Sequence, residues 1–216
     1  MKTIEVPFLE FDTDFPSMGT VSERLSHLEK NKIDQLNWER FDYKPDTVFS
    51  IGFTGHEIML RYWIEEDIFK AEKTESNQDV FEDSCVEFFI APADDGIYYN
   101  LEINAIGTCL LGSGKSRADR IRADRRIIEP IRRISSEGNV PVPETTGKKS
   151  WNITLAIPFK VFFRHQINTL KGMRCRANFY KCGDKLARPH YLTWSPVKTE
   201  KPDFHRPEFF GSLRFA

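Results

Sequence analysis

The stretch that most constrains the fold is a strand–turn–strand pattern between residues 79 and 104. Side chains alternate along Cys85–Ile90, so that Cys85, Glu87 and Phe89 share one face and the opposite face is entirely apolar. Asp94, Asp95 and Gly96 supply a polar turn, and Tyr98–Asn104 then resumes the alternation. The pattern predicts a β-hairpin with one face on a hydrophobic core and one polar face.

The polar face of this hairpin is a candidate binding surface. Pairing of the two strands brings Glu87, Glu102 and Asn104 together, with Phe81 and Asp83 where the first strand begins. A pyranose has apolar C–H faces that stack on aromatic rings and hydroxyl groups that need hydrogen-bond partners. A polar floor with an aromatic residue at its rim therefore fits a sugar better than a protein core.

Further alternating runs indicate that the whole chain is built from strands. They cover residues 49–53, 58–65, 105–111, 151–158, 173–182, 190–196 and 209–215. A helix is predicted only for residues 22–36, with one helical turn at 159–163. Short strands, many turns and few short helices predict an all-β fold, an antiparallel β-sandwich of jelly-roll or immunoglobulin-like type.

The length of 216 residues fits a single domain with a sizeable core. We expect residues 1–45 to form a mixed lead-in and residues 46–216 to form the sandwich. Residues 67–78 are polar and are predicted to be a surface loop, and residues 139–149 are a turn-rich connector too short to link domains.

Charge and composition limit the classes of partner. The 31 Lys and Arg residues nearly balance the 32 Asp and Glu residues, so neither nucleic acid nor an anionic membrane is expected as a partner. The arginine-rich segment 117–133 contains interleaved acids, which favours a solvated loop or short helix with internal ion pairs. The pattern does not determine the oligomeric state.

No segment has the length and apolarity of a membrane span, and the amino-terminal residues lack the apolar run of a secretory signal. We therefore expect a soluble protein, cytoplasmic as the sequence stands or extracytoplasmic if a leader has been removed. The four cysteines show neither CxxC spacing nor a histidine at zinc-finger distance, so a structural zinc site is not expected. Cys85 and Cys175 are predicted to be buried free thiols.

The ordered set of strand motifs resembles carbohydrate-binding module family 9 and its relatives in the DOMON-like group. The similarity covers roughly residues 45–216, and the motifs that carry it are Phe81-Glu82-Asp83-Ser84-Cys85-Val86-Glu87-Phe88-Phe89, Tyr99-x-Leu101-x-Ile103-Asn104-x-x-Gly107, Trp151-x-Ile153-x-Leu155-x-Ile157-Pro158, Arg176-Ala177-Asn178-Phe179, Trp194-Ser195-Pro196 and Phe210-Gly211. Such modules are usually attached to xylanases and related glycoside hydrolases, and similar free-standing proteins occur in gut bacteria that degrade glycans.

This resemblance implies a β-sandwich with a slot in which two aromatic rings grip the terminal sugar of an oligosaccharide or polysaccharide. Phe81 matches the first ring and Trp194 the second, and Glu87 would accept hydrogen bonds from hydroxyl groups. Asn178 and Lys181 would supply donors nearby, beside Glu102 and Asn104 on the floor. No cofactor is required, but the family carries structural calcium, for which Asp83, Asp94, Asp95 and Glu87 offer oxygen ligands.

Two positions depart from the family pattern. Phe81 stands where the family has tryptophan, and Glu102 stands where a basic sugar-contacting residue is expected. A phenyl ring offers less stacking area than an indole, and a carboxylate cannot donate a hydrogen bond. The resemblance therefore implies a ligand that differs from the usual one, or weaker binding.

Two alternatives to a non-catalytic binding module stay open at this stage. Glu87 and Glu102 on neighbouring strands could act as the paired carboxyl groups of a glycoside hydrolase or an accessory component, if they face an open cleft. The chain could instead be a DOMON-like interaction domain without a sugar ligand, in which case its own side chains would fill the slot.

Overall fold

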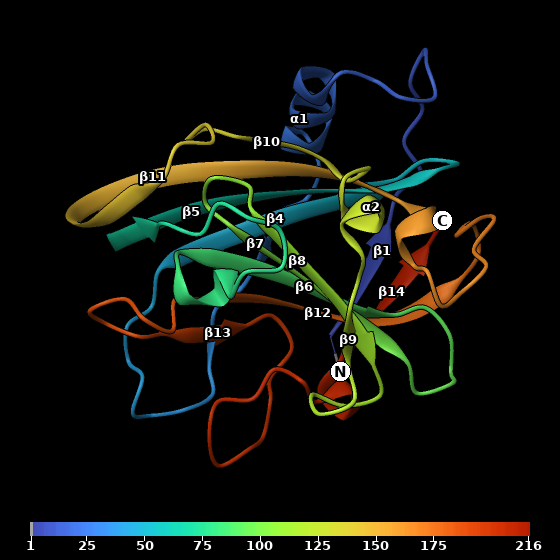
Figure 1. Cartoon of the computed structure of the whole chain (residues 1–216). Coiled ribbons are helices and arrows are strands. Elements are labelled where there is room, and N and C mark those ends of the chain that lie inside the picture. Colours follow the sequence, from blue (N-terminus) through green and yellow to red (C-terminus); the bar gives the residue numbers. More distant parts are fainter. Residues whose placement is uncertain (1) are drawn as a thin grey trace.

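The computed structural model describes residues 2–216 and consists of two β-sheets packed face to face (Figure 1). This arrangement confirms the predicted antiparallel β-sandwich with few short helices. In chain order the elements are β1 (Thr3–Val6), α1 (Met18–Ser26), β2 (Asn31–Lys32), β3 (Gln35–Leu36), β4 (Asp46–Phe53), β5 (Glu57–Ala71), η1 (Val80–Glu82), β6 (Cys85–Ala91), β7 (Tyr98–Asn104), β8 (Cys109–Gly114), β9 (Ile121–Arg122), α2 (Arg125–Ile128), β10 (Arg132–Ser135), β11 (Val142–Pro158), η2 (Phe159–Val161), β12 (Arg174–Cys182), β13 (Tyr191–Thr193), η3 (Pro207–Phe209) and β14 (Gly211–Phe215).

The larger sheet has the order β1-β14-β12-β6-β7-β8-β9. In addition, β13 pairs with β12, and β3 pairs with β13. β1 and β14 pair in parallel, and the other pairs in this sheet are antiparallel. β6 lies in the middle of the sheet, between β12 and β7, strands that are far apart in sequence. Side chains from three separate parts of the chain therefore meet on each face.

The smaller sheet has the order β10-β11-β5-β4-β2. Its two longest strands, β5 and β11, pair antiparallel from Val142 opposite Ala71 to Pro158 opposite Glu57, with two register shifts. Most of the predicted connector at residues 139–149 and the first part of the predicted loop at 67–78 thus lie in paired strands. Residues 143–148 are exposed, which permits their polar, turn-like composition within a strand, whereas Ile68, Phe69 and Ala71 are buried.

The main hydrophobic core fills the space between the sheets. It receives Val86, Phe88 and Ile90 from β6 and Tyr99, Leu101 and Ile103 from β7, the two apolar sets that the alternation predicts to share a face. The opposite faces of the same strands point away from the smaller sheet. A second cluster forms there, including Cys85, Phe89, Tyr98, Tyr180 and Cys182, and loops from the last part of the chain cover it.

The first 45 residues belong to the sandwich and are not a separate lead-in. β1 extends the larger sheet, β2 extends the smaller one, and α1 packs Val21 and Leu25 onto the outer face of the smaller sheet. The predicted helix at residues 22–36 is therefore partly wrong: α1 ends at Ser26 and two short strands follow. Their backbone finds partners in β4 and β13, which residue pattern alone does not show.

A buried ion pair connects the two sheets at one edge of the core. Lys181 Nζ on β12 lies 2.9 Å from Glu66 Oε2 on β5, and both side chains are completely buried. Lys181 Nζ also hydrogen-bonds to His190 Nε2 and donates to the Cys182 carbonyl, and Trp151 Nε1 donates to Glu66 Oε1. Breaking such a pair leaves one uncompensated charge in the interior, so removal of either partner alone would destabilise the sandwich.

Two smaller sequence predictions are also settled. The helical turn at residues 159–163 is confirmed as η2. The arginine-rich segment holds the predicted short helix, α2, with internal ion pairs Arg125–Glu129 and Arg126–Asp124. It also contains β9 and the start of β10, and Arg120 and Arg132 pair with acids outside the segment, which the sequence did not predict. All four cysteines are free and buried. None of the helices among residues 2–216 is long and apolar enough to cross a membrane.

Candidate binding pocket

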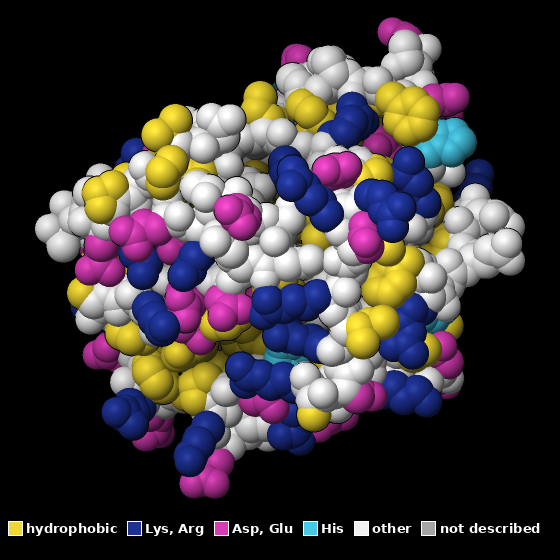
Figure 2. Space-filling view, in the orientation of Figure 1, with side chains coloured by type: hydrophobic (Ala, Val, Ile, Leu, Met, Phe, Trp, Pro, Cys, Tyr) yellow, Lys and Arg dark blue, Asp and Glu magenta, His cyan; other side chains and the backbone are white. Residues whose placement is uncertain are grey.

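A pocket opens on the outer face of the larger sheet, above β6, β7 and the end of β12. The space between its side chains amounts to about 430 Å³, the open mouth included, and it is lined by Phe81, Glu87, Glu102, Arg117, Arg120, Asp184, Tyr191, Pro202, Asp203, Phe204 and His205. In the space-filling view, lysine and arginine side chains border a recess in the lower half of the molecule, with hydrophobic side chains inside it (Figure 2).

Loops that are far apart in sequence form the walls of this pocket. η1 carries Phe81, and its Phe81 carbonyl accepts a hydrogen bond of 2.9 Å from the Asp184 N–H, which ties η1 to the loop after β12. Arg117 and Arg120 come from the connection between β8 and β9, and residues 202–205 come from the segment before η3. The sheet supplies the floor and the loops supply the rim.

Two acids form the floor. Glu87 on β6 lies directly opposite Glu102 on β7, and both are nearly fully buried. Cys182 Sγ donates to Glu87 Oε1 over 3.1 Å, and Glu102 Oε1 accepts from Asn100 Nδ2 at 2.7 Å. Burial, followed by the negative charge of Glu102, raises the pKa of Glu87 well above its usual range. A neutral carboxyl can donate one hydrogen bond and accept others.

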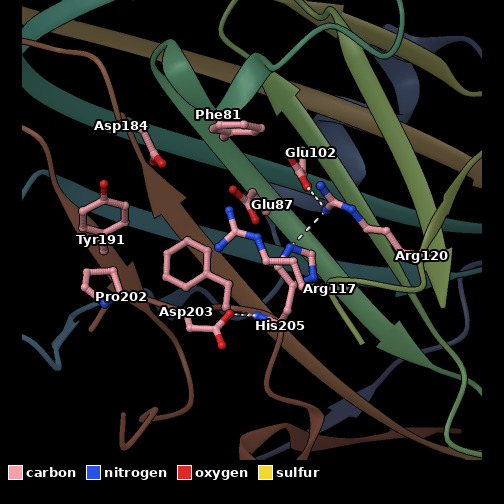
Figure 3. A pocket seen from close by; sticks show the side chains of 11 residues that line it. Phe81, Glu87, Glu102, Arg117, Arg120, Asp184, Tyr191, Pro202, Asp203 and His205 are labelled. Carbon is pink, nitrogen blue, oxygen red and sulfur yellow. Dashed lines mark hydrogen bonds and ion pairs between the residues drawn. The ribbon is translucent and has the colours of Figure 1, made fainter. Parts of the chain in front are cut away.

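The Glu102 carboxylate is held by a different set of contacts. Burial raises the pKa of Glu102, and the neighbouring Arg120 guanidinium and Asn100 amide act in the opposite direction. Arg120 NH1 lies 3.3 Å from Glu102 Oε1 and 3.0 Å from His205 Nε2 (Figure 3). On its other side, His205 Nδ1 lies 2.8 Å from the Tyr98 hydroxyl. This chain of contacts fixes the arginine over the floor.

Asp184 and Tyr191 stand together on another side. Burial, followed by the charge of Glu102, raises the pKa of Asp184 to about 7. Burial and the charge of Asp184 also raise the pKa of the Tyr191 hydroxyl. The pocket therefore combines carboxyl groups whose pKa values are raised by burial with two guanidinium groups.

Aromatic rings line the pocket beside these polar groups. Phe81 and Tyr191 lie on different sides of Glu87 (Figure 3), and Phe204 also contributes its side chain. Arg117 reaches across the pocket and makes no ion pair with the other side chains drawn in Figure 3. Rings together with hydrogen-bonding groups that point inward are what a small polar ligand with apolar faces requires.

The structure brings together three of the seven residues that the sequence suggested. Phe81, Glu87 and Glu102 line the pocket. Their grouping follows from strand register, because Glu87 and Glu102 are direct cross-strand neighbours and η1 precedes β6. The expectation that an aromatic residue at the strand entry borders an acidic floor matches this geometry.

Trp194, expected as the second gripping ring, lies elsewhere. Its ring is buried in the main core, where it packs edge-on against Phe49 and Phe179 and closely against Gly211. The physical reason is strand alternation: Leu192 and Trp194 both point into the core, whereas Tyr191 points to the pocket side. Trp194 thus cannot stack on a ligand in this pocket without leaving the core.

Asn104, Asn178 and Lys181 also lie outside the pocket lining. Asn104 binds the Lys73 carbonyl, Asp83 Oδ2 and the Thr108 N–H, so its amide closes a turn. Asn178 joins β12 to Ser195 through the Ser195 carbonyl and N–H. Lys181 points between the sheets to Glu66, because its position in β12 alternates with those of Tyr180 and Cys182.

The four oxygen ligands proposed for calcium do not form one set. Asp83 precedes β6 whereas Asp94 and Asp95 follow it, and the seven residues of this strand span roughly 20 Å at a rise of about 3.4 Å per residue. Asp83 Oδ2 already accepts hydrogen bonds from the Glu72 and Lys73 N–H groups and from Asn104. The residues suggested by sequence therefore do not fit a shared calcium ion.

Sequence reasoning missed most of the rim. Tyr191 could have been found by extending the alternation from Leu192, but nothing in the pattern shows that the loops carrying Arg117, Arg120, Asp184 and residues 202–205 fold over this face. Their positions depend on contacts such as the Asp184–Phe81 backbone hydrogen bond and the Arg120–His205 contact.

A family model described as carbohydrate-binding family 9 matches residues 21–215. This chain belongs to carbohydrate-binding family 9. The resemblance seen in the strand motifs is thereby confirmed, and the match extends further toward the amino terminus than those motifs did.

Solved structures support the membership and the fold of this family 9 chain. A candidate carbohydrate-binding protein from Bacteroides uniformis is 38% identical, with a TM-score of 0.96 over 100% of this chain and 99% of that one. A family 9 module from Caldicellulosiruptor kristjanssonii in complex with glucose is 10% identical, with a TM-score of 0.60 over 100% of this chain and 96% of that one.

The same family 9 module in complex with cellotriose is 11% identical and has a TM-score of 0.59, over 99% of this chain and 93% of that one. At this level of identity the two complexes establish a shared fold. No curated protein matches the chain significantly. As a family 9 member, the chain is a carbohydrate-binding module of a non-catalytic family.

Proposed function

We propose that this chain binds the terminal sugar of an oligosaccharide or polysaccharide in the pocket on the outer face of the larger sheet, and serves the recognition of glycans during their degradation. The observation that supports this most directly is the joint lining of one pocket by Phe81, Tyr191, Glu87 and Glu102. Family membership supports the class of ligand, and complexes of a distant member with glucose and cellotriose suggest the first sugars to test.

In this proposal the aromatic rings contact the apolar faces of one pyranose unit. Phe81 contacts one side and Tyr191, with Phe204, contacts the other, so that Tyr191 takes the role that the resemblance gave to Trp194. Phe81 and Tyr191 are only half-buried, so contact with an apolar sugar face removes further ring surface from water, which favours binding. Loops enclose the pocket on several sides, which favours the end of a chain over its middle.

Glu87 and Glu102 on the floor of the pocket would then form hydrogen bonds with the hydroxyl groups of the sugar. A neutral Glu87 both donates and accepts, whereas Glu102, held by Arg120 and Asn100, mainly accepts. Arg117 is free to add a donor from above. A site whose buried groups hydrogen-bond to sugar hydroxyl groups discriminates strongly against analogues without those hydroxyl groups, because the buried groups then stay unpaired.

Calorimetric titration with glucose, xylose, cello-oligosaccharides and xylo-oligosaccharides tests the proposal. We expect binding to the wild type, and a loss of about tenfold in affinity in Phe81→Ala, since removing one stacking ring costs roughly 1–2 kcal/mol. Phe15→Ala is the matched control, because Phe15 is 62% exposed and stacks on His56 away from the pocket. Equal affinity in the two variants would contradict the assignment of the pocket.

A catalytic role is the second candidate, favoured by one observation. Glu87 and Glu102 are direct cross-strand neighbours whose pKa values are both raised by burial, as a general acid requires. Overnight incubation with the same oligosaccharides separates the two candidates. Release of new reducing ends that stops in Glu87→Gln would support hydrolysis, whereas binding without release supports the module.

A further inference from the structure

Two cysteines lie next to Glu87 of the pocket floor, on strands that are distant in sequence. Cys85 on β6 is the direct partner of Cys182 on β12, and Glu87 lies two residues further along β6 on the same face. One ligand atom from each of the three residues lies within 4.8 Å of the other two. Cys182 Sγ and Glu87 Oε1 are already 3.1 Å apart.

This set of atoms matches the preference of thiophilic divalent cations. Zinc binds thiolate sulfur at about 2.3 Å and carboxylate oxygen at about 2.0–2.2 Å, so two such ligands of a tetrahedral ion are roughly 3.6–3.8 Å apart. The three atoms reach this spacing through small rotations of their side chains. Calcium and magnesium, which prefer oxygen ligands, do not fit two sulfur atoms.

The position in the pocket supplies a path and an open coordination site. Cys85, Glu87 and Cys182 are all nearly fully buried, but Glu87 also lines the pocket that opens to solvent. An ion would reach the two sulfur atoms past Glu87, and a water molecule from the pocket would complete its coordination. A site with three protein ligands and one open position is a recognised arrangement for zinc.

Neighbouring cations offset the negative charge of the ligand set. Two thiolates and one carboxylate around a divalent ion leave one excess negative charge. Burial raises the pKa of Cys85 to about 12 and the pKa of Glu87 well above its usual range, and the Lys181 ammonium and the Arg120 guanidinium act in the opposite direction on Cys85 and Glu87 respectively. The ion displaces the thiol protons when it binds.

We propose that Cys85, Cys182 and Glu87 form a binding site for a thiophilic divalent cation, of the zinc and cadmium class, at the floor of the pocket. The site was not visible in the sequence, because zinc motifs are recognised by short spacings and these ligands come from two strands brought together by the sheet. The proposal does not depend on sugar binding, since it rests on the three ligand atoms alone.

Titration of the reduced, metal-free protein with Cd²⁺ tests this proposal through the ultraviolet absorption of cadmium–thiolate bonds. We expect one ion per chain with the intensity of two thiolates. The band should disappear in the Cys85→Ser/Cys182→Ser variant and persist in Cys109→Ser/Cys175→Ser. This control is matched, because Cys109 and Cys175 are also free and buried but lie in the main core.

Glu87→Gln provides a second measurement that does not remove a cysteine. We expect the cadmium–thiolate band to remain at saturation while the affinity for Cd²⁺ falls by at least about tenfold, because one charged ligand is lost. An absent band in the folded wild type, a band that survives in Cys85→Ser/Cys182→Ser, or an unchanged affinity in Glu87→Gln would each overturn the proposal.

Discussion

Glu87 and Glu102 occupy directly opposed positions of β6 and β7 and lie almost entirely out of water. Two carboxylates in such a place lose hydration and repel each other, so the pKa of Glu87 rises well above its usual range. Burial thus favours the protonated form of Glu87, beside an acid held by Arg120. This mixture of donors and acceptors suits hydroxyl groups.

Trp194 provides a test at the residue scale. Because its ring packs in the core, we expect Trp194→Ala to lower the free energy of unfolding by about 3–5 kcal/mol, and Trp194→Phe to lower it by less. Denaturant unfolding measures both values. Sugar affinity of the folded Trp194→Phe protein should stay within about twofold of wild type.

The opposite result for Trp194 would be equally clear. A Trp194→Phe protein with wild-type stability and no affinity for sugars would place the ring in the binding site and contradict the core position. Tyr191→Phe serves as the comparison, since it removes only the hydroxyl group of a residue that lines the pocket.

The contrast between these two residues shows what sequence can predict at this scale. Alternation places Glu87 and Glu102 on one face correctly, because both lie inside regular strands with a short turn between them. Tyr191, the second aromatic residue of the pocket, lies in the three-residue strand β13, and Trp194 directly follows that strand. The two residues are three positions apart, an odd number, so their side chains point to opposite faces of the sheet.

At the scale of elements, strands were predictable and loops were not. Alternation with a period of two predicts the strands, and most of the predicted runs agree with the observed strands to within a few residues at their ends. The pocket walls instead combine η1, the β8–β9 connection and the segment after β13, which are held by single contacts such as Asp184 N–H to the Phe81 carbonyl. Such long-range contacts leave no periodic pattern in the sequence.

The ion pair between β5 and β12 gives a prediction at this scale. Lys181→Met leaves Glu66 charged and buried, so we expect it to lower the free energy of unfolding by roughly 3–5 kcal/mol. The double variant Lys181→Met/Glu66→Gln removes both charges and keeps an acceptor for Trp151. It should be less destabilised than the single variant in urea unfolding.

This double-mutant comparison has a definite contrary outcome. If the double variant lost as much stability as the sum of both single variants, the two side chains would act independently. The Lys181–Glu66 ion pair would then contribute no coupling energy to the stability of the sandwich.

At the scale of the whole molecule, the half-buried His205 links stability to pH. Burial, with the charges of Arg120 and Arg117, lowers the pKa of His205 to about 3 from an ordinary value of 6.5. Below pH 6.5 the unfolded chain takes up a proton that the folded chain does not. Stability is therefore retained above this pH and lost as the pH falls toward the folded pKa.

Comparison with His205→Gln isolates this contribution from that of the buried acids, which have the opposite sign. Between pH 6.5 and 4.5 we expect wild type to lose stability relative to the variant by about 1.4 kcal/mol per pH unit. Chemical denaturation at several pH values measures the difference. Parallel curves for the two proteins would show that His205 titrates normally in the folded state.

The whole chain combines the fold of a family 9 module with a pocket that departs from the residues the resemblance implied. Its fold matches such a module at 10% identity, whereas the pocket has Phe81 where tryptophan was expected and Glu102 where a basic residue was expected. A sandwich tolerates such changes because its loops and outer face do not carry the core. Differences in sugar preference between members would arise at these positions.

A crystal structure of the protein with the oligosaccharide that binds most tightly tests the assignment of the pocket most directly. We expect the terminal sugar to lie between Phe81 and Tyr191, with its hydroxyl groups within hydrogen-bond distance of Glu87 and Glu102. A sugar bound on any other surface, with this pocket unchanged, would contradict the assignment.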